Sequence, residues 1–224
     1  MANFKIYPLN LGRLVRKQDM PIVAFYLTDG VHHVLLDTGG VPADGKSFMP
    51  YYQKKDENLE AQLGALGVGL EDIEIVIISH LHWDHMSNNH LFPHAKIYLQ
   101  RAEYHYACDP VPRDKFAFDL EKIIHTNWTL LDGDEEILDG LSVLHVGGHS
   151  PGFQCVIVDT EKGRCGLTSD FITEYKQWES DPMIPGDIYT DIIEYYRGLK
   201  KLSKACDSII PGHNYEVLQH KVLP

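Results

Sequence analysis

The sequence has no hydrophobic run that approaches the roughly 20 apolar residues needed to cross a membrane. Its first eight residues lack the basic and then long apolar regions of an export signal. Positive charge is scarce as well, because 20 Lys and Arg stand against 32 Asp and Glu and leave a net charge of −12. Such a balance is unfavourable for a protein that tracks phosphate backbones. We therefore expect a cytoplasmic protein with no membrane and no nucleic acid as a partner.

Cysteine is limited to four residues, none of them in a Cys-x-x-Cys pair. They are Cys108, Cys155, Cys165 and Cys206. In a chain without an export signal we expect reduced thiols that behave as small buried hydrophobic residues. Internal repeats, low-complexity tracts and long linkers are also absent. The chain of 224 residues is long enough for a sizeable core, so we expect a single domain over residues 1–224.

Four potential metal ligands stand close together in the segment from Ser79 to His85, Ser-His-Leu-His-Trp-Asp-His. The segment follows an apolar, β-branched run at residues 74–78 that predicts a buried strand. His80 and His82 are two residues apart, so an extended backbone points both side chains the same way. Asp84 and His85 are adjacent, so their side chains point in different directions, which suits two sets of ligands better than one. Imidazole and carboxylate are donors that Zn²⁺ and similar metals prefer.

Three later segments each place one more ligand where a predicted strand meets a loop. His149 lies in the turn Gly-Gly-His-Ser-Pro-Gly, Asp170 ends a short strand, and His213 follows a strand and a Pro-Gly turn. Strand-to-loop junctions are the usual place for chemistry on a rigid scaffold. One histidine after a turn is weak evidence, but the ordered series His-x-His-x-Asp-His, His, Asp, His predicts a metal centre.

Two metal ions would allow hydrolysis without a serine or cysteine nucleophile. Metal coordination lowers the pKa of water from about 15.7 toward about 7, so a bridging hydroxide becomes available to attack a carbonyl carbon. The metals would also stabilise the charge that develops on the carbonyl and leaving-group oxygens. Asp84 keeps a free carboxylate oxygen while it binds metal, so we expect it to carry a proton to the leaving group. This chemistry does not distinguish an ester, lactone, amide or thioester.

With these motifs, the sequence from about residue 20 onward resembles the metallo-β-lactamase-fold hydrolases. The resemblance implies that His80, His82 and His149 hold one metal ion, that Asp84, His85 and His213 hold the second, and that Asp170 bridges the two. It also implies two divalent ions, zinc first, with Mn, Fe and Co as alternatives. Asp37 matches a strand-end aspartate of the family, and we expect it to order the loop beneath the metals.

The expected fold is an α/β structure, an αββα sandwich of two mixed β-sheets flanked by helices. The order of the predicted elements agrees with this fold: strands early in the chain, a helix, further strands and a final helix over residues 187–204. The periodicity predicts strands over residues 21–28 and 31–36, joined at Asp29-Gly30, and a helix over residues 57–66. The stripe of the final helix, which begins with Ile188, is interpreted as core packing.

The stretch Gln100-Arg101-Ala102-Glu103-Tyr104, together with the His149 turn and Asp170, resembles the N-acyl homoserine lactonases. These enzymes open the lactone ring of small signalling molecules. The stretch is interpreted as a helix start that packs on the sheet.

The sequence departs from the lactonase family in the predicted pocket. The family tyrosine that follows the bridging aspartate is Thr173 here, so Tyr175 is the candidate to assist at the carbonyl. Met86 replaces a small residue and is expected to change the floor of the pocket. Residues 171–186 are interpreted as an apolar lid, with core packing as the alternative.

Other functions remain open from the sequence. A glyoxalase-II-like thioesterase would use the same ligands, although only about ten residues follow His213, too few for a glutathione-binding helical extension. A cyclic-amide or aryl-ester hydrolase is a further enzyme alternative. Outside the enzymes, the chain would be a metal-binding sensor. The substrate is expected to be a small molecule, and a homodimer is one option for the assembly.

Overall fold

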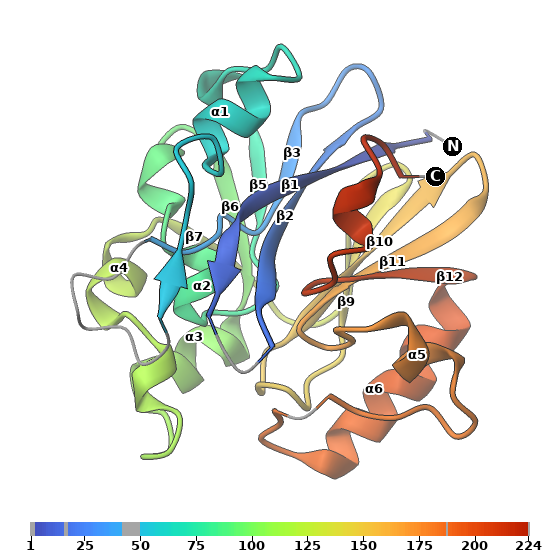
Figure 1. The fold of residues 1–224 in the computed structure, drawn as a ribbon. Helices are drawn as coiled ribbons and strands as arrows, with labels where there is room; N and C mark the ends of the chain where they lie inside the picture. The colour runs from blue at the N-terminus through green and yellow to red at the C-terminus, as the bar shows by residue number, and fades with distance from the viewer. Residues whose placement is uncertain (1–2, 16–17, 42–49, 187, 224) are drawn as a thin grey trace.

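Two mixed β-sheets lie face to face in the computed structural model, which describes residues 3–15, 18–41, 50–186 and 188–223 (Figure 1). The first sheet has seven strands, in the spatial order β4 (Tyr51–Tyr52), β1 (Lys5–Leu14), β2 (Met20–Thr28), β3 (Val34–Leu36), β5 (Ile75–Ile77), β6 (Lys96–Gln100) and β7 (Trp128–Leu131). The pairs from β3 through β7 are parallel, and the others are antiparallel. Parallel strands bring their carboxyl ends to one edge of the sheet.

The second sheet has five strands, in the order β12 (Ser208–Pro211), β11 (Gly163–Ser169), β10 (Gln154–Thr160), β9 (Leu141–His145) and β8 (Glu135–Leu138). Only the β11–β12 pair is parallel among the paired strands of this sheet. The ends of β11 and β12 are therefore at the same edge. Asp170 directly follows β11, and His213 lies two residues beyond β12.

Helices cover the outer faces of both sheets (Figure 1). Beside the first sheet lie α1 (Leu59–Gly64), α2 (Trp83–Met86), α3 (Arg101–Cys108) and α4 (Leu120–His125); beside the second lie α5 (Tyr175–Glu179) and α6 (Ile192–Ala205). Short 3₁₀ turns complete the chain at η1 (Leu70–Asp72), η2 (Asn89–Leu91), η3 (Lys115–Ala117) and η4 (Val217–Gln219). None of the described helices is long and apolar enough to span a bilayer.

Three apolar layers hold the sandwich together. Along β2, Val23 and Phe25 face the second sheet, whereas Ala24 and Tyr26 face the helices of the first. This alternation follows from the two-residue period of a strand, and it lets one strand contribute to two layers. A third layer lies between the second sheet and α6. The expected αββα sandwich is confirmed, and all four cysteines are free, three of them buried.

The boundaries of several elements differ from the prediction for local reasons. The final helix begins at Ile192 rather than at residue 187, because the Asp191 carboxylate accepts from the backbone N–H groups of residues 193 and 194 and caps the helix. Ile188 therefore lies outside the helix, and its side chain is 45% exposed rather than part of the core stripe. The strand predicted from residue 31 begins at Val34, because Asp29 accepts from two turn N–H groups and lengthens the turn.

Tyr195 fixes the segment that carries Asp170 and the residues after it. Its ring stacks on Phe171 with centroids 4.4 Å apart, its hydroxyl donates to the Phe171 carbonyl, and the Gly186 N–H donates to that hydroxyl at 2.9 Å. Tyr195→Phe keeps the ring but leaves buried backbone groups without this partner, so we expect a loss of about 1–3 kcal/mol in the free energy of unfolding. Urea unfolding followed by circular dichroism measures it.

Tyr196→Phe is the matched control, because Tyr196 lies on the same helix and is 47% exposed. Its loss is expected to stay within about 0.5 kcal/mol. Equal effects of the two substitutions would contradict the role given to the Tyr195 hydroxyl.

Candidate metal centre

The loop after β5 contributes four of the predicted ligands. His82, the N-cap of α2, has an extended backbone, and the chain then turns into that short helix, so Asp84 and His85 lie on its first turn. His80, Asp84 and His85 are all buried. The three other predicted ligands approach from the second sheet: His149 from the turn between β9 and β10, Asp170 after β11 and His213 after β12.

The seven predicted ligands form two adjoining groups. Within each group the candidate ligand atoms all lie within 4.8 Å of one another. The first group contains His80, His82, His149 and Asp170. The second contains Asp84, His85 and His213. The fold therefore brings together side chains that are separated by up to 133 positions in the sequence, between residues 80 and 213.

The carboxylate of Asp170 lies between the two groups. Its Oδ1 is 2.7 Å from His213 Nε2 and 3.0 Å from His85 Nε2, both in the second group. Its Oδ2 faces the first group, at 3.6 Å from His149 Nε2 and 3.8 Å from His80 Nε2. One carboxylate thus presents a different oxygen to each group, the arrangement that a bridging ligand requires.

Asp37 holds the loops beneath the two groups together. Its carboxylate accepts from the Ser79 N–H at 2.7 Å, the Ser79 hydroxyl at 2.9 Å and the Ser169 hydroxyl at 3.0 Å, and it lies 2.9 Å from His85 Nδ1. Ser79 Oγ in turn lies 3.0 Å from His80 Nδ1. Asp37 and Ser169 have φ of +60° and +44°, which non-glycine residues rarely adopt. The expected ordering role of Asp37 agrees with these contacts.

Two more histidines are oriented by backbone carbonyl groups. His149 Nδ1 lies 2.9 Å from the Ile188 carbonyl oxygen, and His213 Nδ1 lies 2.7 Å from that of Pro21. When Nδ1 carries the proton and donates it outward, Nε2 keeps its lone pair and faces the other ligands. His82 turns Nδ1 inward instead, 3.3 Å from His149 Nε2.

Several inward atoms are buried without a hydrogen-bond partner. They are His80 Nε2, His85 Nε2 and Asp170 Oδ1; the last two face each other at 3.0 Å but not in hydrogen-bond geometry. Leaving such atoms unpaired costs free energy, so a cluster of them at one point indicates a group that the protein is built to hold. Nitrogen and carboxylate donors in two sets, joined by a shared carboxylate, fit divalent metal ions.

The electrostatics of the site favour the same conclusion. Burial lowers the pKa of both His82 and His149 to about 4, so both are neutral near pH 7, as metal ligands must be. Burial acts in the same direction on His85 and His213, but the nearby carboxylates, Asp170 foremost, together outweigh it and raise the pKa of each. Asp170 therefore needs positive charge beside it, which a divalent cation supplies more strongly than a proton.

Two hollows open beside the seven residues. One has an apolar lining that includes Leu14, Met20, Trp83 and Phe116, and it reaches His82 and Asp84. The other is lined by polar side chains that include Gln18, Asp19, Thr173, Glu174, Asn214 and Tyr215. Both hollows contain His149, Asp170, His213 and Ile188. A substrate bound at the centre would thus contact an apolar surface on one side and a more polar surface on the other.

Some predicted pocket residues lie elsewhere. Tyr175 packs against the core and lines a separate hollow near Phe4 and Leu223, so we assign it no role at a carbonyl. Thr173 does reach the polar hollow, where its hydroxyl donates to Gln177 Oε1 at 3.2 Å. Met86 is fully buried in the core on the helix side of the first sheet and does not form the pocket floor.

The expected apolar lid over residues 171–186 is largely core. Phe171 and Ile172 are buried, and Trp178 and Met183 pack against the layer under α6. Ile184 is the exception, with 53% of its surface exposed.

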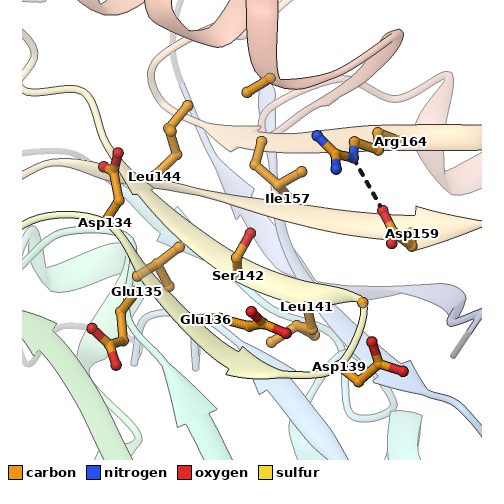
Figure 2. A pocket seen from close by; sticks show the side chains of 13 residues that line it. Asp134, Glu135, Glu136, Asp139, Leu141, Ser142, Leu144, Ile157, Asp159 and Arg164 are labelled. Carbon is orange, nitrogen blue, oxygen red and sulfur yellow. Dashed lines mark ion pairs between the residues drawn. The ribbon is translucent and has the colours of Figure 1, made fainter. Parts of the chain in front are cut away.

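An acidic hollow on the outer face of the second sheet is separate from this centre (Figure 2). Its charged rim consists of Asp134, Glu135, Glu136, Asp139, Asp159 and Arg164. Two of these acids are already paired, Asp159 with Arg164 at 3.4 Å and Asp134 with Lys201 at 2.5 Å. The hollow accounts for part of the net negative charge and shares no residue with the two groups.

Ile188 and Glu103 are two residues of the site that sequence reasoning missed. Ile188 was interpreted as a core residue. It belongs to the site because its carbonyl oxygen lies 2.9 Å from His149 Nδ1 and the residue lines both hollows. Glu103 belongs to the stretch that resembles the lactonases, so the sequence drew attention to it, but no function could be assigned to its side chain.

Comparisons with known proteins agree with this geometry. The model of the metallo-beta-lactamase superfamily matches residues 19–213. An N-acyl homoserine lactonase of Bacillus cereus is 30% identical over 184 residues, which cover 75% of this chain and 70% of that protein. N-acyl homoserine lactonase AttM of Azorhizobium caulinodans is 27% identical over 257 aligned positions, which cover 96% and 94% of the two chains.

Solved structures share the fold over almost the whole chain. A quorum-quenching N-acyl homoserine lactone hydrolase is 26% identical with a TM-score of 0.79, and the match covers 96% of this chain and 94% of that one. An N-acyl homoserine lactone hydrolase with the product N-hexanoyl-L-homoserine at its catalytic metal centre has a TM-score of 0.80 at 24% identity, covering 98% and 96%. The chain belongs to the metallo-beta-lactamase superfamily and, within it, to the family of the N-acyl homoserine lactonases.

Proposed function

We propose that this protein is a metal-dependent lactonase with two divalent ions that opens N-acyl homoserine lactones or related lactone rings. The observation that carries the proposal is the Asp170 carboxylate, which presents one oxygen to each of two groups of ligands. Among the bonds that such a centre could hydrolyse, the names of the relatives favour a lactone, which is a carboxylic ester within a ring. Nothing in the centre calls for a serine or cysteine nucleophile.

The metal-binding roles follow the two groups. His80, His82 and His149 would hold one ion. Asp84, His85 and His213 would hold the other. Asp170 would contact both. Bound divalent ions lower the pKa of water and polarise carbonyl oxygens. Zinc suits the mixture of imidazole and carboxylate ligands, and Mn, Fe and Co remain alternatives.

Asp84 is placed to move a proton to the leaving-group oxygen. Its carboxylate lines the apolar hollow and lies 3.7 Å from His85 Nε2 and 4.0 Å from His213 Nε2. Hydrolysis of a lactone releases a proton from the attacking water and needs one at the departing alkoxide oxygen. A carboxylate held at the edge of the centre could accept the first proton and pass it to that oxygen. The acyl part of the substrate would lie in the apolar hollow and the more polar part in the other.

The organisation of the whole protein belongs to the same proposal. We propose one catalytic domain over residues 1–224 that acts on a small-molecule substrate. The cytoplasmic location and the homodimer stay predictions.

Lactone opening is the direct test. The protein loaded with Zn²⁺ is expected to hydrolyse N-acyl homoserine lactones and simple γ-lactones. A chelator is expected to abolish turnover, because the metal ions would lower the pKa of the attacking water and polarise the carbonyl oxygen. Hydrolysis is measured by proton release, with S-lactoylglutathione as a parallel substrate. Efficient thioester hydrolysis without lactone opening would contradict the proposal and support the thioesterase.

Asp84→Asn tests the proton transfer. The amide keeps the shape but cannot carry a proton, so turnover is expected to fall by about 10²- to 10⁴-fold. Metal content is measured on the same samples, so that loss of an ion is distinguished from loss of proton transfer. Asp159→Asn makes the same change of charge on the distant surface of β10 and should leave turnover unchanged. A metal-loaded Asp84→Asn with normal turnover would exclude this role for Asp84.

A further inference from the structure

Glu103 is a buried acid that stands outside both groups of predicted ligands. It lies in the first turn of α3, which follows β6, and its side chain has no exposed surface. A buried carboxylate is costly unless hydrogen bonds compensate for the lost water. Three donors surround this one: the Leu81 N–H at 3.0 Å, the Ser150 hydroxyl at 2.7 Å and the Gly152 N–H at 3.0 Å.

The three donors belong to two loops, each beside a histidine of the first group. Leu81 lies between His80 and His82, and Ser150 directly follows His149. The Glu103 carboxylate therefore joins the loop after β5 of the first sheet to the turn before β10 of the second. Each of its oxygens serves a different loop, Oε1 the first and Oε2 the second. Moving either loop would break at least one of these bonds.

The backbone around Gly152 shows how closely the turn approaches α3. A Cβ atom at residue 152 would lie 2.1 Å from the Glu103 nitrogen and 2.4 Å from its Cβ. Any larger residue would push the turn away from the helix. Glycine therefore lets the Gly152 N–H reach the carboxylate, and it ties the position of His149 to the start of α3.

The burial of Glu103 raises its pKa, while the bonds from Leu81, Ser150 and Gly152 oppose that effect. All three partners donate, so they favour a carboxylate that only accepts. The acid contacts both loops through backbone and hydroxyl donors rather than through an imidazole.

We propose that Glu103 is a positioning residue that sets the distance between the His80–His82 pair and His149, and thereby the affinity of one of the two metal positions. The inference rests on the proposed function. In the second group, His85 is oriented by Asp37 and His213 by the Pro21 carbonyl instead. Loss of Glu103 should therefore weaken the binding of one metal ion and leave the binding of the other unchanged.

Glu103→Gln is the sharpest substitution. A glutamine has one accepting oxygen and one NH₂ group, so it can serve Leu81 and donate to Ser150, but its NH₂ then faces the Gly152 N–H. We expect one of two metal equivalents to dissociate about 10- to 100-fold more readily, with the second unchanged. The measurement is a competition between the Co²⁺-loaded protein and a chromophoric chelator, with the Co²⁺ spectrum as a second readout.

Thr160→Val is the matched control. Thr160 is a buried residue at the far end of β10, where its hydroxyl donates to the Gly163 carbonyl at 2.8 Å. This variant should lose stability and keep wild-type dissociation of both ions. If Glu103→Gln does not fold, Ser150→Ala replaces it, since it removes one donor and leaves the acid in place; the same ion should then be lost more readily.

The outcomes separate this inference from the proposed function. A wild-type protein that binds no pair of ions, or opens no lactone, would refute the proposed function. With wild-type binding and turnover established, a folded Glu103→Gln that loses stability but keeps both dissociation rates would overturn the positioning role. Equal weakening of both ions would overturn the assignment to one metal position.

Discussion

The largely buried carboxylate of Asp170 is the group on which the rest of the centre depends. Its two oxygens face two different sets of imidazoles, and burial without compensating charge would be prohibitive. The fold answers this constraint by topology. The strands β5, β11 and β12 end at one edge, where the two sheets meet, so the loops that follow them converge. The apolar layers beneath remain intact because the charged side chains lie beyond the strand ends.

Two further buried carboxylates stabilise the loops around that centre. Asp37 receives hydrogen bonds from Ser79 in the loop after β5 and from Ser169 at the end of β11, and it contacts His85. Glu103 joins the loop after β5 to the turn before β10. Each acid is held by donors at the ends of both sheets or in the loops that follow their strands, so the separation of the sheets and the geometry of the ligands are coupled. Asp37 adopts a positive φ, which strains the backbone, and its hydrogen bonds to both loops hold it in that conformation.

The sequence pointed to the seven side chains that the fold brings together, because their main signal is local. The residues His80 to His85 fall within six positions after a recognisable strand, and the strand-to-loop pattern repeated at Asp170 and His213. The αββα sandwich was predicted for the same reason, since the period of each element is local. The final helix was placed about five residues too early because the capping role of Asp191 was not recognised.

Other features depend on contacts that no local pattern encodes. The strand β1 was not predicted, because Pro8 and Gly12 interrupt its alternation and its pairing with β2 comes from the tertiary fold. The carbonyl groups of Pro21 and Ile188 orient His213 and His149 across 192 and 39 positions, and any residue type could supply them. Tyr175 was a reasonable candidate by its distance from Asp170, yet α5 turns its ring into the core.

Locating the metal ions themselves tests the central claim most directly. Anomalous X-ray scattering from crystals of the Zn²⁺-loaded protein should show two peaks about 3.5–4 Å apart, with Asp170 in contact with both. One peak should lie beside His80 and the other beside His213. A single peak, or two peaks away from the seven side chains, would contradict the account.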